Sequence, residues 1–525
     1  MEICTCPAED MPGRNSLYAR FSACLLEKPN AVIALFGVYY LVQIVVRLLL
    51  PPALRIDEAQ QVLFAQWLAL GYDAQPPLYN WYQQVFFEIF GTSLLGLAVA
   101  KNLMLFLIFA IYVKLADTVL KEKRLVIVAA LAFFLSPQLF WQAQRDLTHT
   151  TMLMLTGLWA IYTSVRLLQR PTTLGYVLTG LAVGLGMLSK YNFIVILLAT
   201  LLAVWFHPNG RERIFDRRFL LTIGISLLVF LPHSIWLFDN LQFASDVTLR
   251  RMAEKAPESR WMQILTGIAR VVIGSVIVII LPALMLVACR RTKREPERQT
   301  PGEASWLRFF IHYFLALGTV LLVIIVTTTM TEVRDRWLLP LVMPFPILGA
   351  LWLERRTFDV ASFVKKVLPV CLVVMALVPV ALIVSVPVQA MFGKTSRSNN
   401  DWEIFRHHLQ DKGITPSLIV TSDWFTGGNM RFLFPEITVA TTTYDDFDPA
   451  FRLSADRPVL FVWTTWRDPS ESMRQWLEAQ MGANLKDLSI QTFEAPMHFK
   501  VEGKIQRFSY IVIKPDNVVK PSGQP

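Results

Sequence analysis

The sequence predicts an α-helical polytopic membrane protein with a small α/β domain at its C-terminal end. Of its 525 residues, 54% are hydrophobic and only 17% are charged, and the mean hydropathy is +0.44. Soluble proteins have about a quarter of their residues charged. Apolar stretches recur up to residue 390, and the composition after residue 393 is that of a soluble domain. These observations exclude a soluble multidomain, disordered or fibrous protein.

Eleven apolar segments have about the length that crosses the hydrocarbon core of a bilayer. The predicted spans are 31–50, 93–115, 124–143, 148–168, 174–189, 191–206, 219–238, 264–289, 307–330, 337–353 and 366–390. The stretch from 174 to 206 is ambiguous, because Ser189-Lys190-Tyr191-Asn192 interrupts it near its middle. It forms either one long span or two short ones.

The distribution of Lys and Arg decides between these alternatives, because basic loops stay on the cytoplasmic side. With two spans across 174–206, the N-terminus and five basic loops share one side and hold 23 Lys and Arg residues, against nine in the opposite loops. The sequence therefore predicts a cytoplasmic N-terminus (1–30), a transmembrane domain (31–393) and an outer soluble domain (394–525). The net charge of +10 reflects these loops and anionic lipid, and it does not indicate nucleic acid.

Cysteines and the N-terminus indicate no further chemistry. The five cysteines show no zinc or redox spacing. None follows Cys371, so no internal disulfide is expected in the C-terminal domain. The first 30 residues lack a signal-peptide pattern, and the apolar segment after them is long enough to remain as a span.

The C-terminal domain alternates predicted strands and helices, which is typical of a small α/β fold. Strand-like runs lie at 417–422, 437–443, 458–465 and 508–514. Helical patterns lie at 401–412 and 470–481. In the first helix, Asp401 is the expected N-cap and Gly413 the stop signal.

The first outer loop, residues 51–92, carries the most informative motifs. Asp57 and Glu58 follow the first span and begin an apolar helix pattern that runs to Leu70. The turn Gln75-Pro-Pro-Leu-Tyr-Asn-Trp81 leads into a second amphipathic helix, which its second proline is suited to open. Two amphipathic helices in one loop are expected to lie in the membrane interface.

These motifs resemble those of bacterial relatives of the protein O-mannosyltransferases and of the lipid A aminoarabinose transferase, which are membrane glycosyltransferases with the GT-C fold. The resemblance includes the Asp57-Glu58 pair, the Pro-Pro-Leu-Tyr-x-Trp turn, the Lys190 break and the Arg334-Asp-Arg336-Trp-Leu-Leu-Pro segment. It covers most of the chain and extends to 422–435, which is similar to the start of the family's outer domain. It implies a bacterial inner-membrane protein with a periplasmic C-terminal domain.

Two positions depart from the family pattern. Many relatives have Lys or His just before the double proline, where this chain has Gln75. Many also have an acid at the top of the fourth span, where this chain has Thr150 and the nearest acid is Asp146. Because positions i and i+4 share a helix face, either residue remains a candidate for that position.

The resemblance implies that a sugar moves from a polyprenyl-phosphate donor to a hydroxyl group. This transfer needs a base that accepts the hydroxyl proton and cations that stabilise the departing phosphate. Asp57 is the predicted base, and Glu58 and Asp146 are further catalytic candidates. The structural alternative is an ordinary helix start, with Asp57 as N-cap and Glu58 in the first turn.

Cations of the outer loops are the candidates for the donor phosphate: Arg145, Lys190, Arg334 and Arg336. Arg binds phosphate through paired hydrogen bonds, and Lys acts as a point charge. Lys190 lies between two short apolar segments, where an unpartnered charge is costly, or it reaches the headgroups instead. For the two arginines the alternative is a local ion pair with Asp335. Three cations near the outer ends of spans are weaker candidates: Arg47, Lys101 and Arg270.

Residues of the turn and of the second loop helix, with one histidine, are expected at the sugar or acceptor: Gln75, Tyr79, Trp81, Tyr82 and His149. The alternative for His149 is a buried structural histidine. His407 and His408 are expected on the solvent face of their helix. The sequence does not require a divalent cation, and the metal dependence stays open.

The predicted function is that of a glycosyltransferase that acts on lipid A, lipopolysaccharide core or another surface glycan. Protein O-glycosylation is the first alternative. Galacturonate, an amino sugar and mannose are all open as the sugar. A lipid-sugar flippase or transporter is the alternative from another class, although the chain shows no related halves. The expected partners are the polyprenyl-phosphate donor, a glycolipid or glycan acceptor and membrane lipids.

Overall fold

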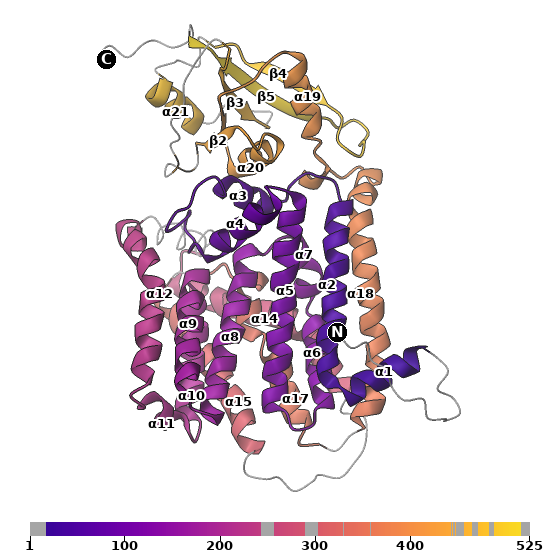
Figure 1. Ribbon diagram of the computed structural model, residues 1–525, viewed down its shortest axis with the longest axis vertical. Helices are drawn as coiled ribbons and strands as arrows, with labels where there is room; N and C mark the ends of the chain where they lie inside the picture. Colours follow the sequence, from indigo (N-terminus) through magenta and orange to yellow (C-terminus); the bar gives the residue numbers. More distant parts are fainter. Residues whose placement is uncertain are drawn as a thin grey trace. The chain divides into compact units, whose positions relative to one another are not determined.

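The structure is a computed structural model. It describes residues 17–242, 257–288, 303–328, 330–356, 359–442, 444, 447, 456–464, 471–481 and 488–515. The described chain is mostly helical, with one small sheet (Figure 1). It divides into two compact units. The helical unit comprises Met1–Val42, Leu70–Tyr79 and Lys101–Val378, and the mixed unit comprises Gln43–Ala69, Asn80–Ala100 and Pro379–Pro525.

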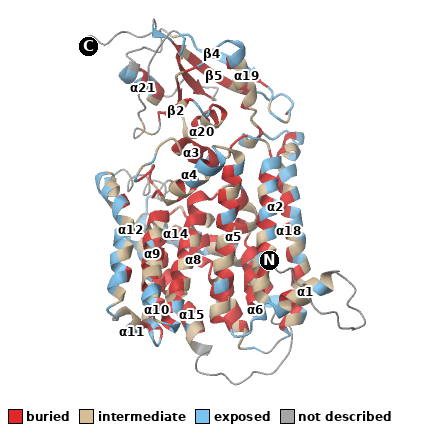
Figure 2. Cartoon of the chain, viewed as in Figure 1, coloured by how far each residue is buried: buried red, intermediate tan, exposed pale blue. Residues whose placement is uncertain are grey.

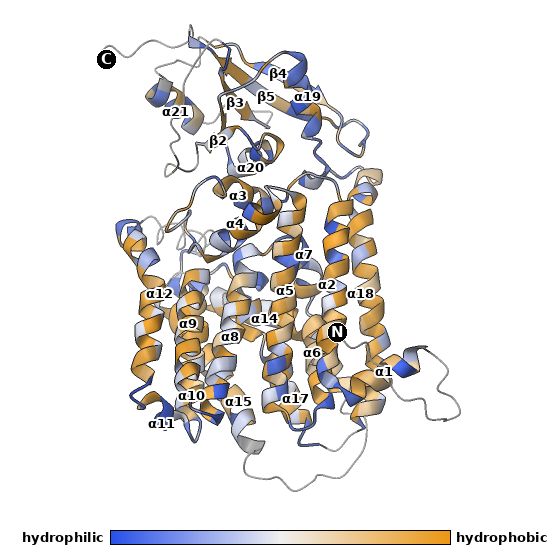
Figure 3. Ribbon diagram, in the orientation of Figure 1, coloured by the Kyte–Doolittle hydropathy of each residue, from blue (hydrophilic) through white to orange (hydrophobic). Residues whose placement is uncertain are grey.

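Seven described helices are long and apolar enough to cross a membrane. They are α2 (Val32–Leu49), α5 (Leu94–Val119), α8 (Thr148–Gln169), α12 (Phe219–Asp239), α14 (Arg260–Ala288), α15 (Glu303–Thr327) and α18 (Val360–Met391). Hydrophobic residues dominate these helices (Figure 3). Each of the seven coincides with a predicted span.

Two further predicted spans are bent helix pairs. α6 (Arg124–Phe134) meets the helical segment Gln138–Arg145 at 64°, and α16 (Asp335–Val342) meets α17 (Phe345–Leu353) at 43°. Pro137 and Pro344 lie at these breaks, where a proline removes a backbone donor and clashes with the preceding turn. The last two predicted spans are the shorter apolar helices α9 (Thr173–Ser189) and α10 (Phe193–Phe206).

α9 and α10 are separate helices that fold back on each other, which confirms the two-segment alternative for 174–206. The break lies at Lys190-Tyr191-Asn192. At the other end of the hairpin, the hydroxyl of Tyr176 in α9 donates to the carbonyl of Arg213, beyond the end of α10, at 3.1 Å. In one continuous helix the two ends of this stretch would be about 50 Å apart.

Glycines allow α9 to pack closely on α12. A Cβ at Gly180 would lie 2.7 Å from the carbonyl oxygen of Thr222, and a Cβ at Gly184 would lie 2.7 Å from the Cβ of Val229. Small residues four positions apart let membrane helices approach in this way. The rest of α12 is largely exposed (Figure 2), so its other face is free to contact lipid.

The sheet of the mixed unit has the strand order β2-β1-β3-β5-β4. Its strands are β1 (Leu418–Thr421), β2 (Thr438–Thr441), β3 (Val459–Trp463), β4 (Gln491–Ala495) and β5 (Gln506–Ile513). β1 pairs in parallel with β2 and β3, and β5 pairs antiparallel with β3 and β4. The four predicted strands are confirmed. β4 was not predicted, because its sequence Gln-Thr-Phe-Glu-Ala is short, polar and half exposed.

Three helices accompany the sheet: α19 (Glu403–Asp411), α20 (Trp424–Leu433) and α21 (Glu471–Met481). The predicted helices correspond to α19 and α21, and Gly413 has the positive φ of +65° expected after a helix end. The predicted N-cap is wrong, because Trp402 and not Asp401 precedes α19. α20 was not predicted; Asp423 caps it by accepting hydrogen bonds from the backbone of Phe425 and Thr426.

The prediction that His408 lies on the solvent face is wrong. Its ring stacks on Phe493 at 4.0 Å, and its Nε2 lies 2.9 Å from the hydroxyl of Tyr510. Its neighbour His407 is exposed, as predicted. The pattern misled because a histidine can cover an apolar sheet with its ring while its nitrogens find a polar partner.

The remaining helical segments are short. They are α1 (Leu17–Glu27), η1 (Pro29–Ala31), α3 (Ile56–Phe64), α4 (Leu78–Phe90), η2 (Gln138–Gln142), α7 (Ala143–Arg145), α11 (Gly210–Ile214) and η4 (Arg397–Asn399). Of these, α3, α4, η2 and α7 carry predicted site residues or lie next to them.

Candidate functional site

Asp57 and Glu58 occupy the first turn of α3 in the mixed unit. The N-cap is Arg55, so Asp57 does not have the capping position that the structural alternative required. Asp57 is half-buried. A carboxylate in the first turn is favoured by the helix dipole, which makes this a stable place for a negative charge.

Glu58 is 3% exposed and is held by Arg47, in the last turn of α2. Nε of Arg47 donates to Oε1 of Glu58 at 3.0 Å, and Nη2 donates to Oε2 at 2.9 Å. The backbone N–H of Arg55 donates to Oε2 as well, at 3.0 Å. Both carboxylate oxygens of Glu58 are therefore engaged. This geometry makes Glu58 an anchor for the start of α3.

α3 packs against α20 of the C-terminal domain, a contact that the sequence did not reveal. Gly428 faces Ala59 so closely that an added Cβ would lie 2.0 Å from the carbonyl oxygen of Ala59. The apolar residues Val62 and Leu63 of α3 join the core of the sheet domain. The apolar face of α3 is therefore used within the protein.

Hydrogen bonds extend this contact on both sides of α3. The side chain of Gln66 bonds both the N–H and the C=O of Val439 on the edge strand β2, each at 2.9 Å. At the other end, the buried Asn429 accepts a hydrogen bond from the N–H of Leu54 at 3.0 Å. The C-terminal domain thus binds both ends of the segment that carries Asp57.

Within the mixed unit, α4 directs polar residues inward and apolar residues outward. Nδ2 of Asn80 donates to Oε1 of Gln61 at 3.1 Å, and both side chains are buried. The apolar side chains Val85, Ile89 and Phe90 are exposed. An exposed apolar stripe on a membrane protein is expected to lie in the lipid interface.

Trp81 and Tyr82 use their polar atoms to join neighbouring segments. The indole N–H of Trp81 donates to the carbonyl of Ala69 at 2.8 Å, and the hydroxyl of Tyr82 donates to that of Ala100 at 2.7 Å. Both side chains are half-buried. Because these N–H and O–H groups are already used, a sugar or an acceptor would contact the ring faces of the two side chains.

In the helical unit, the segment before α8 has three irregular features. The π-helical turn η2 covers Gln138–Gln142, the chain bends by 64°, and Leu147 adopts the left-handed conformation with φ +84°. Such a conformation is rare for a residue with a branched side chain and is often found at functional sites. Arg145 is exposed and Asp146 is half-buried, and both directly precede Leu147.

Two contacts bring further predicted residues to the start of α8. The ring of Tyr79 lies 5.7 Å from that of His149, and both side chains are buried. Nζ of Lys190 donates to Oγ1 of Thr150 at 3.3 Å. Lys190 therefore lies beside the position where the family pattern has an acid.

Arg334 and Arg336 do not form the local ion pair with Asp335 that was the alternative to phosphate binding. Oδ2 of Asp335 accepts a hydrogen bond from Nε2 of Gln138 at 2.8 Å, and Oδ1 accepts from the backbone N–H of Arg336. In the part of the chain that the structure describes, neither arginine side chain forms an ion pair. The carboxylate is thus satisfied by other donors, and both guanidinium groups are available to an anion. Of the weaker candidates, Arg270 lies 3.8 Å from Glu332 and Lys101 is buried.

The turn Leu70–Tyr79 is attached to the hairpin break through one histidine. Nδ1 of His233 lies 2.8 Å from the carbonyl of Leu70, and its Nε2 lies 3.3 Å from the hydroxyl of Tyr191. In this turn Oε1 of Gln75 is buried and has no hydrogen-bond partner among the described residues. Gln75 therefore keeps an acceptor that a ligand hydroxyl can use.

The predicted site residues divide between the two units. Asp57, Glu58, Trp81 and Tyr82 belong to the mixed unit, and the helical unit contains the others: Gln75, Tyr79, Arg145, Asp146, His149, Lys190, Arg334 and Arg336. Among the described residues, no group of three or more His, Cys, Asp or Glu side chains is placed to hold a metal ion. Sequence reasoning missed the partners that fix these residues, namely Arg47 for Glu58 and Gln138 for Asp335, because nothing local signals either pairing.

Comparisons with known proteins agree with this architecture. The family model of dolichyl-phosphate-mannose-protein mannosyltransferases matches residues 74–236. The lipopolysaccharide core galacturonosyltransferase RgtB of Rhizobium johnstonii is 32% identical over 484 residues, which are 91% of this chain and 96% of RgtB. RgtA of the same organism, with the same described activity, is 32% identical over 486 residues, 92% of this chain and 97% of RgtA.

A solved structure supports the fold. ArnT from Cupriavidus metallidurans in the apo state matches 94% of this chain and 99% of its own, with a TM-score of 0.52 and 14% sequence identity. At this identity the match shows the shared fold alone. The predicted architecture of many membrane helices followed by a small α/β domain is confirmed.

Proposed function

Because the chain belongs to the glycosyltransferase family of the lipopolysaccharide core galacturonosyltransferases, we propose that it transfers galacturonic acid to the core of lipopolysaccharide. The observation that carries this proposal is the 32% identity shared with both relatives over more than 90% of the chain. The family membership identifies the chain as a glycosyltransferase, as the sequence predicted, and argues against the flippase alternative. It also favours galacturonate over the other sugars that the sequence left open.

The donor in this proposal is a polyprenyl-phosphate sugar. A lipid donor suits a chain with many apolar helices and with an exposed apolar stripe on α4. The reaction forms a bond between the acceptor oxygen and the anomeric carbon while the bond from that carbon to the phosphate oxygen breaks. The polyprenyl phosphate leaves with the bonding electron pair, and a base takes the proton of the acceptor hydroxyl.

We assign the base to Asp57. It is half-buried in the first turn of α3, and its neighbour Glu58 is engaged by Arg47. A defined backbone position restricts where the carboxylate can be, and proton removal by a positioned base typically accelerates a reaction about 10²–10⁴-fold. Asp146 is the second candidate, because it lies beside the left-handed Leu147.

We assign the donor phosphate to cations of the helical unit. Lys190 donates a hydrogen bond to the hydroxyl of Thr150, which places its charge at the start of α8. Asp335 is satisfied by Gln138, which leaves the guanidinium groups of Arg334 and Arg336 unneutralised. A fork-shaped guanidinium and a point charge together stabilise the dianionic leaving group. Arg145 stays a further candidate, and no role for a metal is assigned.

Reconstitution tests the function. The purified chain in proteoliposomes is supplied with polyprenyl-phosphate galacturonate and, in parallel, with the matching mannose and aminoarabinose donors. The acceptors are lipopolysaccharide core, lipid A and a serine-rich peptide. The expected product is core carrying one added uronosyl residue, detected by mass spectrometry. Transfer to the peptide alone, or from another donor alone, would contradict the proposed substrates.

We also propose that the protein lies in the bacterial inner membrane, with its N-terminus in the cytoplasm and its C-terminal domain in the periplasm. The excess of Lys and Arg in the loops on one side supports this orientation. In a cysteine-free background, a membrane-impermeant thiol reagent is expected to label Lys412→Cys in intact cells and to label Lys121→Cys only after lysis. The opposite pattern would reverse the orientation.

A further inference from the structure

An apolar cavity of about 190 Å³ lies inside the helical unit, far along α9 from Lys190. Its walls come from α8, α9, α10 and α12, and Arg213 and Ile214 of α11 also line it. Leu167, Leu201 and Ile223 are typical of the lining. None of the predicted site residues lines it, so the cavity has no part in the site described above.

The hydroxyl groups in the wall are already satisfied. Five Ser and Thr side chains line the cavity, and each donates to a backbone carbonyl: Ser164, Thr179, Thr200, Thr222 and Ser226. They have no unused donor to offer a bound molecule. A cavity of this kind stays dry and takes up apolar groups.

Arg213 is the exception in this wall. Its Nε is buried and has no hydrogen-bond partner among the described residues. Its Nη1 lies 3.4 Å from Oε2 of Glu212, but that carboxylate is 73% exposed, so the pair is weak. A buried charge-bearing donor without a partner is costly, and an anion at this end of the cavity would remove the cost.

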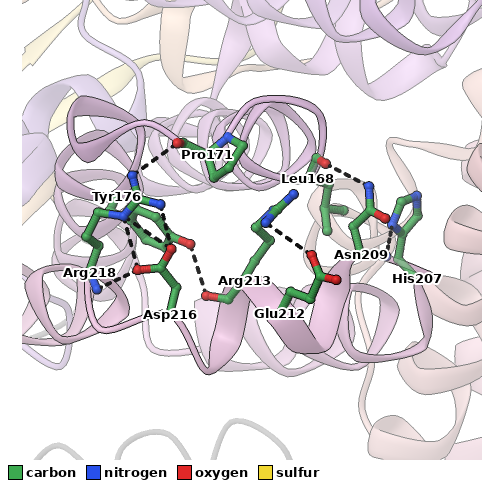
Figure 4. A network of polar contacts seen from close by, with 9 residues as sticks. All are labelled: Leu168, Pro171, Tyr176, His207, Asn209, Glu212, Arg213, Asp216 and Arg218. Carbon is green, nitrogen blue, oxygen red and sulfur yellow. Dashed lines mark hydrogen bonds and ion pairs between the residues drawn. The ribbon is translucent and has the colours of Figure 1, made fainter.

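The charges around Arg213 favour an anion over a neutral ligand (Figure 4). Asp216 is paired with Arg218 through Nη2 at 2.6 Å, and the guanidinium of Arg211 stacks on Trp205 at 5.0 Å. The pairing with Arg218 lowers the pKa of Asp216. The segment 207–218 holds four arginines against two acids, so positive charge remains after every pair is made.

We propose that this cavity holds one acyl chain of an anionic membrane phospholipid, with its phosphate bound by Arg213. A hydrocarbon chain fits the satisfied, apolar wall, and a phosphate fits the guanidinium of Arg213, whose buried Nε has no partner among the described residues. α12 forms one wall and otherwise exposes apolar side chains such as Leu227 and Leu228, which suits entry from the bilayer. Anionic lipids gather where basic loops meet the membrane surface, which makes a phospholipid the occupant.

A photoactivatable phosphatidylglycerol with a diazirine on its acyl chain tests the proposal. The full chain in nanodiscs is irradiated, and labelled peptides are mapped by mass spectrometry. Labels are expected on α8, α9, α10 and α12. Arg213→Gln is expected to lower this labelling about tenfold or more, since a charge-assisted contact is lost. Arg211→Gln, on the same loop but outside the cavity wall, is the matched control and should label normally.

Filling the cavity gives a second test that does not depend on the headgroup. Ala160→Leu on α8 and Thr179→Leu on α9 each place a larger side chain in the wall, and either one is expected to reduce the labelling if it folds. Galacturonosyl transfer by these variants checks that folding. Equal labelling of Arg213→Gln and Arg211→Gln would overturn the proposal. Displacement of the label by polyprenyl phosphate, but not by unlabelled phosphatidylglycerol, would overturn the identity of the occupant.

Discussion

Arg47 and Glu58 face each other through two hydrogen bonds of 3.0 and 2.9 Å, with side chains that are only 7% and 3% exposed. Arg47 lies in the last turn of α2, and Glu58 lies next to the proposed base. Removing two charges from water is costly, and a buried pair returns that cost only while both partners are present. The pair therefore fixes the position of the start of α3 rather than adding net stability.

Removing one partner of this buried ion pair should be strongly destabilising. Glu58→Gln and Arg47→Gln are each expected to lower the free energy of unfolding by about 3–5 kcal/mol, because each leaves a buried charge alone. Thermal unfolding of the purified chain measures this, and the exchange Arg47→Glu with Glu58→Arg should restore part of the loss. Arg406→Gln, whose partner Glu403 is 40% exposed, is the control and should cost below about 1 kcal/mol. Equal losses in the free energy of unfolding for the buried and surface variants would show that the Arg47–Glu58 pair does not fix the start of α3.

Replacing the proposed base separates a chemical role from a structural one. Asp57→Asn keeps the size of the side chain but cannot accept a proton at neutral pH, so transfer should fall about 10²–10⁴-fold. Donor binding and the thermal midpoint should stay unchanged, and Asp57→Ala should be similarly inactive. Asp411→Asn, an exposed carboxylate on α19, is the control for charge loss. Near-normal turnover of Asp57→Asn would move the base to Asp146.

Loss of a phosphate-binding cation should appear in donor affinity. Lys190→Ala and Arg336→Ala are each expected to weaken binding of polyprenyl phosphate about tenfold to 150-fold, which corresponds to a charge-assisted contact. Binding to the chain in nanodiscs can be measured by native mass spectrometry. Lys366→Ala, an exposed cation at the start of α18, should bind normally. If both variants keep the wild-type affinity, neither residue contacts the phosphate.

The close approach of α20 and α3 predicts a sensitive glycine. Gly428→Ala places a Cβ 2.0 Å from the carbonyl oxygen of Ala59, so the helices must separate at a cost of about 1–3 kcal/mol. Transfer activity should fall together with stability, because α3 carries Asp57. Gly318→Ala meets no atom within 4 Å and serves as the matched control. The prediction fails if Gly428→Ala is as stable and as active as Gly318→Ala.

Two adjacent histidines should differ in their effect on acid stability. Burial, followed by the charge of Lys412, lowers the pKa of His408 below its usual value. The unfolded chain then binds more protons than the folded chain below about pH 6.5, so this residue makes stability fall as the pH is lowered through that range. His408→Gln should remove that part of the pH dependence, measured as thermal midpoints at pH 7.5 and 5.5. His407→Gln should keep it, and identical pH profiles of the two variants would contradict the assignment.

The membrane helices were predictable because the length of an apolar run is itself the structural requirement. The break at Lys190 was predictable because two spans across 174–206 put the basic loops on one side of the membrane. The bends at Pro137 and Pro344 were not predicted, because a proline alone does not mark a break: Pro232 and Pro282 lie inside the single helices α12 and α14. The left-handed Leu147 was not predicted, because it depends on how neighbouring segments pack. Asp57 was recognised from its motif, whereas the residues that hold its segment in place are distant in sequence.

The contacts of α3 illustrate this limit. The alternation of polar and apolar residues correctly indicated an amphipathic helix at Asp57, but the predicted end at Leu70 is wrong, because α3 ends at Phe64. It did not indicate what the apolar face contacts, and the lipid interface was the simplest expectation. In the structure that face packs against α20. The sequence of α20, Trp-Phe-Thr-Gly-Gly-Asn-Met, has no strong helical pattern. The glycines of α20 allow α3 to approach closely, so their role follows from the packing of α3 and not from the sequence of α20 alone.

The hydrogen bond from Leu54 to Asn429 joins residues 375 positions apart. At about 5–20 residues per second of synthesis, roughly 20–75 s pass between the emergence of these two residues from the ribosome. During that interval the segment with Asp57 has left the translation machinery without its partner helix, and the apolar side chains of α3 lack their packing surface. A chain that stops before α20 would thus contain every membrane helix that the structure describes and the proposed base, but the apolar face of α3 would lack its packing surface. Completion of the last domain therefore sets the earliest moment at which a newly made molecule can work.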